Sequence, residues 1–213
     1  MFQPAVFRET RSEVMRDHMR DQPFATIVSS ATGGLTADHV PLVLKSEGDL
    51  GVLHGHIASA NPLFRKTEGS IEVLVIFQGP QTYVSPSWYA SKKEHGKVVP
   101  TWNYVVVHAG GKLNFTRDTD WLLDHLDDLT TQHESNRDAP WKVSDAPEEF
   151  IAGQLKALVG FEIEITDLSG TWKVSQNKSA ADQTGVSMGL ENSANLNELS
   201  ISRLVRERGR RAR

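Results

Sequence analysis

The sequence predicts an α+β fold, built mainly from antiparallel β-strands, in which a barrel-like sheet carries helices on its outside. Strand-like runs occupy much of residues 24–116, two amphipathic helical segments follow, and a further strand-like stretch begins at Gly160. Strands grouped before helices, with a late return to the sheet, are typical of α+β domains. Doubly wound proteins alternate strands with helices, so the sequence excludes that class.

The first segments predict one helix followed by an antiparallel meander. Residues 10–21 carry apolar side chains at helical spacing, and Thr10 and Glu13 stand at the spacing of a capping box. Three strand-like runs follow, separated by turns that contain glycine: residues 24–30, 35–44 and 50–57. Runs joined by such turns are expected to pair as neighbours in the sheet.

A short helix and two long strands are predicted next. Asn61 and Pro62 are typical of a helix start, because Asn caps the first turn and Pro loses no hydrogen bond there. Strand-like runs then begin at Ile71 and at Tyr104. A glycine pair at 110–111 interrupts the second run, which suggests a bulge or a corner.

Two amphipathic helices are predicted at residues 118–134 and 147–159, since apolar side chains recur there at helical spacing. Residues 160–168 alternate apolar with acidic side chains, as a strand with one buried face does. The segment 171–177 can add a short partner strand.

The C-terminal end differs in composition from the rest of the chain. From Ser179 the sequence becomes polar and small, and it ends with a helical pattern near residues 197–208. A chain of 213 residues with 38% hydrophobic residues can bury one substantial core. We therefore predict a barrel domain over residues 1–178 and a C-terminal helical extension with a basic tail over residues 179–213.

Composition excludes several classes of protein. The net charge of −4 argues against a globally basic nucleic-acid binder. Without cysteine the chain has no disulfide, no thiolate nucleophile and no cysteine-ligated metal. The N-terminal residues lack the features of a signal peptide, and no apolar run approaches the roughly 18 residues that span a bilayer. We expect a cytoplasmic protein that does not enter a membrane.

The stretch HGHIASANP offers a binding site for an anion. Neither a Walker motif nor a GxGxxG turn is present, so a nucleotide phosphate would need another cradle. A strand that ends at Ile57 and a helix that begins near Asn61 direct backbone N–H groups and the positive end of a helix dipole at an anion. Ser59, Arg65 and Lys66 add donors and cations. The alternative is an ordinary capped helix.

Three histidines suggest a second kind of site. His54 and His56 point to one face of a strand, and His39 lies on the preceding strand. A three-histidine metal site, or an axial histidine for haem, is one interpretation. Exposed or hydrogen-bonded core histidines are the other interpretation, and we predict no metal.

Residues 81–104 gather five aromatic side chains around a charged loop. They contribute two of the five tryptophans and all three tyrosines: Tyr83, Trp88, Tyr89, Trp102 and Tyr104. Such a cluster offers a flat apolar surface with polar tips, which suits a planar heteroaromatic ring. The alternative is that these rings pack the loop against the barrel or against a partner subunit.

Four sequence blocks together resemble the PaiB-type family of FMN-binding regulators. They occur in the family's order and at about its spacing: HGHIASANP at 54–62, FQGP at 77–80, QTYVSPSWYASKKEHGKVVPTWNY at 81–104 and WKVSQN at 172–177. The likeness runs from residue 2 to about residue 190. It implies an FMN-binding split β-barrel with peripheral helices, which binds its cofactor at a homodimer interface to which both chains contribute.

The resemblance also implies which residues bind the flavin. His39 and His56 match positions on the cofactor side of the family's sheet, and Gln78, Tyr83 and Trp102 are implied contacts from the partner side. The SQN block has a hydroxyl and amides that can bond the pyrimidine edge of a flavin. With the anion cradle, the predicted cofactor site comprises His39, His56, Ile57, Ser59, Asn61, Lys66, Gln78, Tyr83, Trp102, Ser175, Gln176 and Asn177.

Two functions follow, and a third is a minor alternative. Relatives of the PaiB kind are described as negative transcriptional regulators, which implies DNA as a partner. An FMN-dependent oxidoreductase on the same barrel, either a flavin reductase or an oxidase, is the second, since FMN itself carries such chemistry. A haem-binding split barrel is the third.

An arginine-rich tail is the part of the sequence that suggests contact with DNA. Its arginines are Arg203, Arg206, Arg208, Arg210, Arg211 and Arg213. Such a cluster can bind phosphates with release of counterions, although a solvated tail is the alternative. The sequence contains no helix-turn-helix or zinc-finger pattern.

Overall fold

The computed structural model describes the backbone of residues 1–30 and 33–211, and side chains as far as residue 208. The chain divides into two compact units. Unit 1 comprises Met1–Arg11, Gln78–Val107 and Ser169–Arg213, and unit 2 comprises Ser12–Phe77 and His108–Leu168. The domain boundary predicted near residue 178 stays a prediction.

The strands form an antiparallel sheet that curls into a half-barrel. Its members are β1 (Arg8–Glu9), β2 (Phe24–Ser29), β3 (Thr36–Pro41), β4 (Val43–Lys45), β5 (Val52–Ala58), β6 (Ile71–Val84), β7 (Thr101–Thr116) and β8 (Leu158–Lys173). They are hydrogen-bonded in the order β3-β2-β6-β7-β8-β5-β4, and β1 pairs with the unit 1 part of β8. The long strands β6, β7 and β8 each contribute residues to both units. The predicted α+β class is confirmed.

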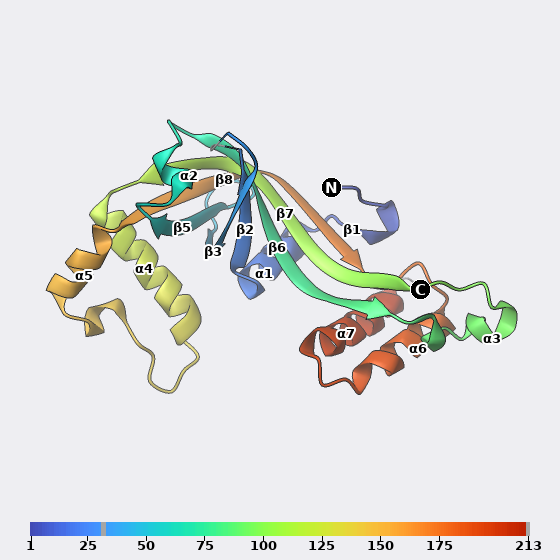
Figure 1. Ribbon diagram of the computed structural model, residues 1–213. Coiled ribbons are helices and arrows are strands. Elements are labelled where there is room, and N and C mark those ends of the chain that lie inside the picture. Colours follow the sequence, from blue (N-terminus) through green and yellow to red (C-terminus); the bar gives the residue numbers. More distant parts are fainter. Residues whose placement is uncertain (31–32, 212–213) are drawn as a thin grey trace. The chain divides into compact units, whose positions relative to one another are not determined.

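Seven helices appear in the described part of the chain: α1 (Ser12–Asp21), α2 (Pro62–Arg65), α3 (Ser91–His95), α4 (Thr119–Glu134), α5 (Glu148–Leu155), α6 (Ala180–Glu191) and α7 (Leu196–Arg211). Within unit 2, α1 packs on β4, and α4 packs on β4 and β5. Within unit 1, α6 and α7 lie side by side, as the two red helices of Figure 1. None of the helices described here is long and apolar enough to cross a membrane.

The pairing predicted for the three runs over residues 24–57 is confirmed. The run 24–30 forms β2, which pairs with β3, and the run 50–57 forms β5, which pairs with β4. The sequence did not indicate the outer neighbours, which are β6 beside β2 and β8 beside β5. Pro41 ends β3 because it has no N–H for the ladder. Buried Leu42 then separates β3 from β4, so the single run predicted at 35–44 forms two strands.

The glycine pair at 110–111 lies within β7, and the bulge or corner predicted there stays a prediction. The strand continues through both residues. A Cβ at Gly111 would lie 2.4 Å from the carbonyl oxygen of Glu164 in unit 2. Glycine is needed there because the backbones of β7 and β8 approach closely, which is a different role from a corner.

Helix α6 lies within the helical extension predicted over residues 179–213, but the sequence indicated a helix only near residues 197–208. Its sequence contains Gly185 and Gly189, and glycine weakens an isolated helix by about 1 kcal/mol relative to alanine. The structure shows why the glycines are present, because Trp88 lies directly against both. Tertiary packing therefore stabilises a helix that local propensity does not indicate.

Each unit has its own buried apolar core. Fully buried side chains of unit 2 include Ile27, Leu53, Val75, Leu113, Phe161 and Ile163. Those of unit 1 include Val84, Val174, Val186, Leu190, Ile201 and Val205. Each such aliphatic side chain contributes about 1.5–3 kcal/mol by leaving water.

Candidate functional site

The predicted cofactor residues fall into two groups, one on each unit. Unit 2 carries His39, His56, Ile57, Ser59, Asn61 and Lys66. Unit 1 carries Gln78, Tyr83, Trp102, Ser175, Gln176 and Asn177.

Asn61 shapes the turn between β5 and α2. Its Oδ1 accepts a hydrogen bond from the backbone N–H of Leu63 at 2.8 Å, which confirms the predicted helix cap. Its Nδ2 donates to Oδ1 of Asp38 on β3, also at 2.8 Å. Both polar atoms of the side chain are therefore used inside the protein, and its contribution to an anion site is to hold the turn in place.

The cations of this turn are free to meet an anion. The backbone N–H of Ser59 donates to the carbonyl of Ala157, and that of Asn61 to Ala58, so these parts of the expected backbone cradle are already bonded. Helix α2 has only four residues and a correspondingly small dipole. Arg65 and Lys66, in contrast, are exposed and have no ion pair among the described residues. A phosphate here would be held by side chains.

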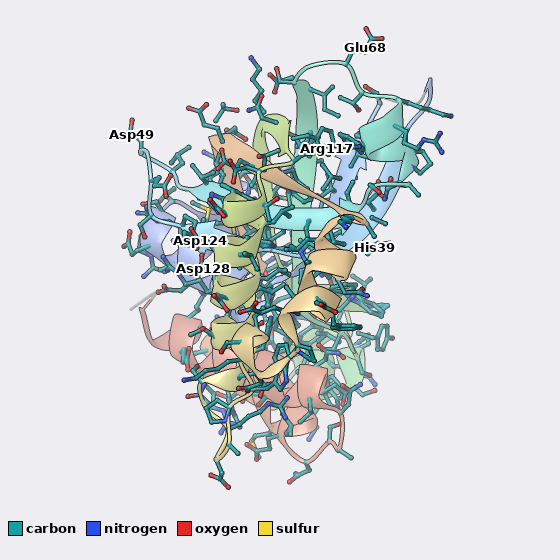
Figure 2. All side chains as sticks on the ribbon, turned by 90° about the vertical axis from the view of Figure 1, so that its left-hand side faces the viewer. His39, Asp49, Glu68, Arg117, Asp124 and Asp128 are labelled. Atoms are coloured by element: carbon teal, nitrogen blue, oxygen red, sulfur yellow. The ribbon has the colours of Figure 1, made fainter. Side chains whose placement is uncertain are left out.

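The histidines named in the sequence do not form one cluster. His39 is exposed on β3, where Nδ1 lies 3.0 Å from Oγ1 of Thr26 and the ring stacks on Phe24. His56 instead lies with His125 of α4, its Nδ1 3.0 Å from Nε2 of that residue. In Figure 2, His39 and the α4 carboxylates Asp124 and Asp128 lie on different sides of unit 2.

Trp121 completes the buried histidine cluster beneath α4. Its ring stacks on His125 with centroids 5.4 Å apart and lies 5.0 Å from the ring of His54. Its indole N–H donates to Oε1 of Glu162 at 2.8 Å, and Nε2 of His54 lies 3.5 Å from the same oxygen. Gly160 is needed below it, since a Cβ there would lie 2.3 Å from the indole ring.

Burial keeps these histidines neutral. It lowers the pKa of His54 and of His56, and together with the nearby His56 and His54 rings it lowers the pKa of His125 to about 3. Nε2 of His54 and Nδ1 of His125 are buried without a hydrogen-bond partner in the described part of the chain. Within that part, no group of three or more His, Asp or Glu side chains is placed to bind a metal ion. The buried cluster packs α4 against the sheet, and the described residues indicate no metal-binding site there.

His125 and Trp121 were missed by the sequence reasoning. The available signal was their spacing of four residues on one helical face, with a second pair two residues apart on a strand. That pattern predicts two facing pairs of rings only if helix α4 is known to pack on strand β5. This packing is a tertiary contact, which the local sequence does not indicate.

In unit 1, Tyr83 and Trp102 form an exposed aromatic pair. Each side chain is 48% exposed, and the rings meet edge to face with centroids 6.4 Å apart. The indole N–H of Trp102 donates to Oε1 of Gln81 at 3.1 Å, which fixes the ring. Gln78 is also exposed, and its Nε2 donates to the carbonyl of Val105. The pair leaves aromatic surface open to a ligand or partner.

The other half of the aromatic segment packs inside unit 1. Tyr89 is only 2% exposed, and Nζ of Lys178 lies 4.9 Å from its ring centre. Trp88 rests on α6, where a Cβ at Gly189 would lie 2.5 Å from its ring. The packing interpretation therefore holds for Trp88 and Tyr89, while Tyr83 and Trp102 remain available.

The SQN block is mostly bonded within the chain. Ser175 is buried with a positive φ of 63°, and its Oγ accepts from Nδ2 of Asn103 at 2.9 Å. The amide of Gln176 bonds back to the N–H of Val174 and to the carbonyl of Trp172. Asn177 is exposed. Contact of this block with a flavin stays a prediction, with Asn177 as its accessible member.

Lys173 is a candidate that the sequence did not indicate. It ends β8 and donates from Nζ to Oγ1 of Thr101 at 2.8 Å, next to Trp102 in sequence. Burial, with the nearby charge of Lys178, lowers the pKa of its ammonium. The end of β8 thus places a cation next to the start of β7, where Trp102 of the exposed aromatic pair lies.

The residues present fit FMN. A flavin ring needs a flat apolar contact with polar groups at its edge, and its phosphate needs cations. Unit 1 offers the first in Tyr83 and Trp102, together with a buried Oδ1 of Asn103 that has no hydrogen-bond partner among the described residues. Unit 2 offers the second in Arg65 and Lys66.

Comparison with known proteins agrees with this chemistry. The family described as "Putative FMN-binding domain" matches residues 1–167. Protease synthase and sporulation protein PAI 2 of Bacillus subtilis (strain 168) is 33% identical over 208 residues, which covers 98% of each chain. An uncharacterized protein of Emericella nidulans is 34% identical, again with 98% of each chain covered. Among solved structures, the FAD and heme binding protein from Mycobacterium smegmatis superposes with a TM-score of 0.58 at 17% identity, covering 78% of this chain and 73% of the other.

This chain belongs to the FMN-binding family, and its resemblance to the PaiB type is confirmed. FMN is the family's cofactor. The structural likeness supports the split-barrel fold. The homodimer, the regulatory role and an enzymatic activity remain predictions.

Proposed function

We propose that this protein is a PaiB-like homodimer that binds FMN between its two copies and acts as a negative transcriptional regulator. The observation that carries the proposal is the exposed Tyr83–Trp102 pair in a chain of the FMN-binding family. Rings left half exposed on a rigid strand pair are typical of surfaces that bind a ligand or a second subunit.

In this proposal the two groups of residues serve different parts of FMN. Ser59, Arg65 and Lys66 of one copy bind the phosphate, at the turn that Asn61 holds. Trp102 and Tyr83 of the partner copy pack on the ring, with Gln78 and Asn177 as hydrogen-bonding neighbours. His39, His56 and Ile57 belong to the strands that support the phosphate turn. When bound, FMN supplies redox chemistry, and these side chains bind and orient it.

The regulatory role rests on family likeness. The name of PAI 2 is "Protease synthase and sporulation protein", and 98% of this chain aligns with it. The structure describes three of the tail arginines. Arg208 pairs with Glu9 and Arg206 with Glu191, whereas Arg203 is exposed and forms no ion pair among the described residues. The side chains of Arg210 and Arg211, and all of Arg213, lie outside the described residues.

Two variants test the cofactor and the dimer together. Trp102→Ala should weaken FMN binding by about tenfold or more, because a stacked aromatic contact of this size contributes roughly 1–2 kcal/mol, and it should raise the monomer fraction in light scattering. Trp141→Ala is the matched control, since Trp141 is 46% exposed and belongs to unit 2. A Trp102→Ala protein that stays dimeric with unchanged FMN affinity would remove the ring assignment.

Separate measurements distinguish the functions. A regulator should retain particular fragments of its own genome in a pull-down, and FMN should change which fragments are retained. Repeated bleaching of bound FMN by NADH or NADPH without oxygen would instead assign an FMN-dependent oxidoreductase. A Soret band after addition of haem, with no flavin binding, would assign a haem-binding barrel.

A further inference from the structure

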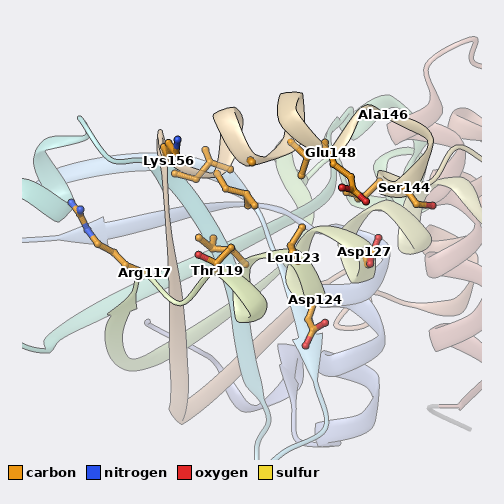
Figure 3. A pocket seen from close by; sticks show the side chains of 15 residues that line it. Arg117, Thr119, Leu123, Asp124, Asp127, Ser144, Ala146, Glu148 and Lys156 are labelled. Carbon is orange, nitrogen blue, oxygen red and sulfur yellow. The ribbon is translucent and has the colours of Figure 1, made fainter.

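Unit 2 contains a pocket of about 930 Å³ that none of the proposed FMN residues lines. It lies between α4 and α5, with the short helical turn Val143–Asp145 and the start of β8 completing its wall. Figure 3 shows the pocket with its lining side chains. Most of the wall is apolar and includes Leu122, Leu123, Val143, Ile151 and Leu155. A cavity of this size and composition is within the range of ligand sites.

Charged side chains are separated along the pocket. Arg117 and Lys156 lie at one end and Asp127 and Glu148 at the other, as the labels of Figure 3 show. The helices explain this arrangement. Helix α4 starts near Arg117 and runs toward Asp127, whereas α5 starts at Glu148 and ends next to Lys156. Eight residues of helix separate the two ends on either side, which is about 12 Å at 1.5 Å per residue.

These four charges have no ion pair within the described part of the chain. Asp128, the next residue on α4, differs because it pairs with Lys45 at 2.6 Å. The guanidinium of Arg117 lies 4.9 Å from the ring centre of Phe64, a contact that orients it without neutralising its charge. Asp124 of α4 lines the pocket as a further carboxylate. The pocket therefore presents two cations and three carboxylates across an apolar floor, and none of them forms an ion pair among the described residues.

We propose that this pocket binds an apolar molecule that carries a carboxylate at one end and an ammonium group about 12 Å away at the other. The carboxylate meets Arg117 and Lys156, and the ammonium meets Asp127 and Glu148. An extended peptide covers roughly 3.3–3.6 Å per residue, so an apolar peptide of about four residues with free ends matches the separation. An ω-amino fatty acid has the same chemistry and is the other source.

The test uses the full-length protein and calorimetric titration with the peptide Leu-Ala-Leu-Ala. We expect saturable binding that weakens about tenfold when the amine is acetylated and again when the carboxylate is amidated, since each block removes one charge-assisted contact. Acetylation should then cost less in Asp127→Asn, where Glu148 alone remains at that end, and amidation should cost less in Lys156→Gln, where Arg117 alone remains. Asp120→Asn is the control, because Asp120 is exposed on α4 and does not line the pocket.

The outcomes distinguish a peptide ligand from an alkyl ligand, and both from the absence of specific binding. Binding of 12-aminododecanoic acid without the peptide, with the same response to both variants, assigns the alkyl source. No binding of either probe, or binding that ignores both end groups and both variants, overturns the proposal. The variants lie outside the proposed FMN residues, so their flavin spectra should match the wild type whether or not the pocket binds a peptide.

Discussion

Asp182 of α6 holds the aromatic segment through two hydrogen bonds to Ser91. Its Oδ1 accepts from the backbone N–H of Ser91 and its Oδ2 from the hydroxyl, both at 3.0 Å. Asp182 is 6% exposed. Burial raises its pKa, but the hydrogen bonds from Ser91 outweigh this effect and hold the pKa below its usual value. The carboxylate thus caps the start of α3 from a distant part of the sequence.

Replacement of Asp182 by alanine should destabilise this segment measurably. A hydrogen bond to a charged group contributes about 1.5–3 kcal/mol, and water replaces part of it because Ser91 is half-buried. We expect Asp182→Ala to lower the free energy of unfolding by about 2–3 kcal/mol, and Asp182→Asn by about 1 kcal/mol, since Asn keeps one acceptor. The loss should appear above the unfolded pKa of about 3.9 and vanish as the pH falls through the lower pKa of the folded state.

Urea unfolding and amide hydrogen exchange check this prediction. In Asp182→Ala, the amide of Ser91 should exchange on the order of 30-fold faster, because about 2 kcal/mol corresponds to that factor. Glu207→Ala is the control, as Glu207 is exposed on α7. Unchanged exchange at Ser91 together with unchanged unfolding would refute the reasoning that Asp182 holds the segment.

Three further perturbations follow from buried contacts. Because His125 is neutral with a pKa of about 3, the unfolded chain binds more protons below about pH 6.5, and stability should fall by about 2–3 kcal/mol on acidification to about pH 4.5, less so in His125→Gln. Arg208→Met should cost about 2–4 kcal/mol in urea, since Arg208 bonds buried Glu9 at 2.5 Å. Gly185→Ala should cost about 1–3 kcal/mol, as its Cβ would lie 2.0 Å from the carbonyl oxygen of Trp88.

Matched controls decide these three cases. His133→Gln, at an exposed site of α4, should keep the wild-type pH dependence. Arg203→Met should change stability by less than about 0.5 kcal/mol. Gly153→Ala has open space around its Cβ and should be neutral or stabilising. If a variant and its control changed stability or its pH dependence equally, the contact assigned to the variant's residue would be refuted.

The strands and long helices were predictable because their signals are local. Helix α4 was predicted from the apolar spacing that includes Trp121 and Leu122, and the start of α2 from the side-chain chemistry of Asn61 and Pro62. Strand order was not predictable, since no local signal places β6 beside β2 or β8 beside β5. Pairing across long sequence separations depends on tertiary packing, which no short window of sequence contains.

The candidate site was predictable in type but not in detail. The aromatic segment was correctly singled out, yet its members divide between exposed Tyr83 and Trp102 and packed Trp88 and Tyr89. That division depends on α6, whose glycines conceal its helical character. The internal hydrogen bonds of Gln176 were also not predictable. A polar side chain near a turn has the same sequence pattern whether it binds a ligand or its own backbone.

The most direct test of the account is a titration of FMN with the purified full-length protein, followed through the visible absorbance band of the flavin. We predict a shifted band that saturates at one FMN for each chain, with weaker binding in Trp102→Ala and in Lys66→Ala but not in Trp141→Ala. An unshifted band at every protein concentration would contradict the claim that this barrel is an FMN site.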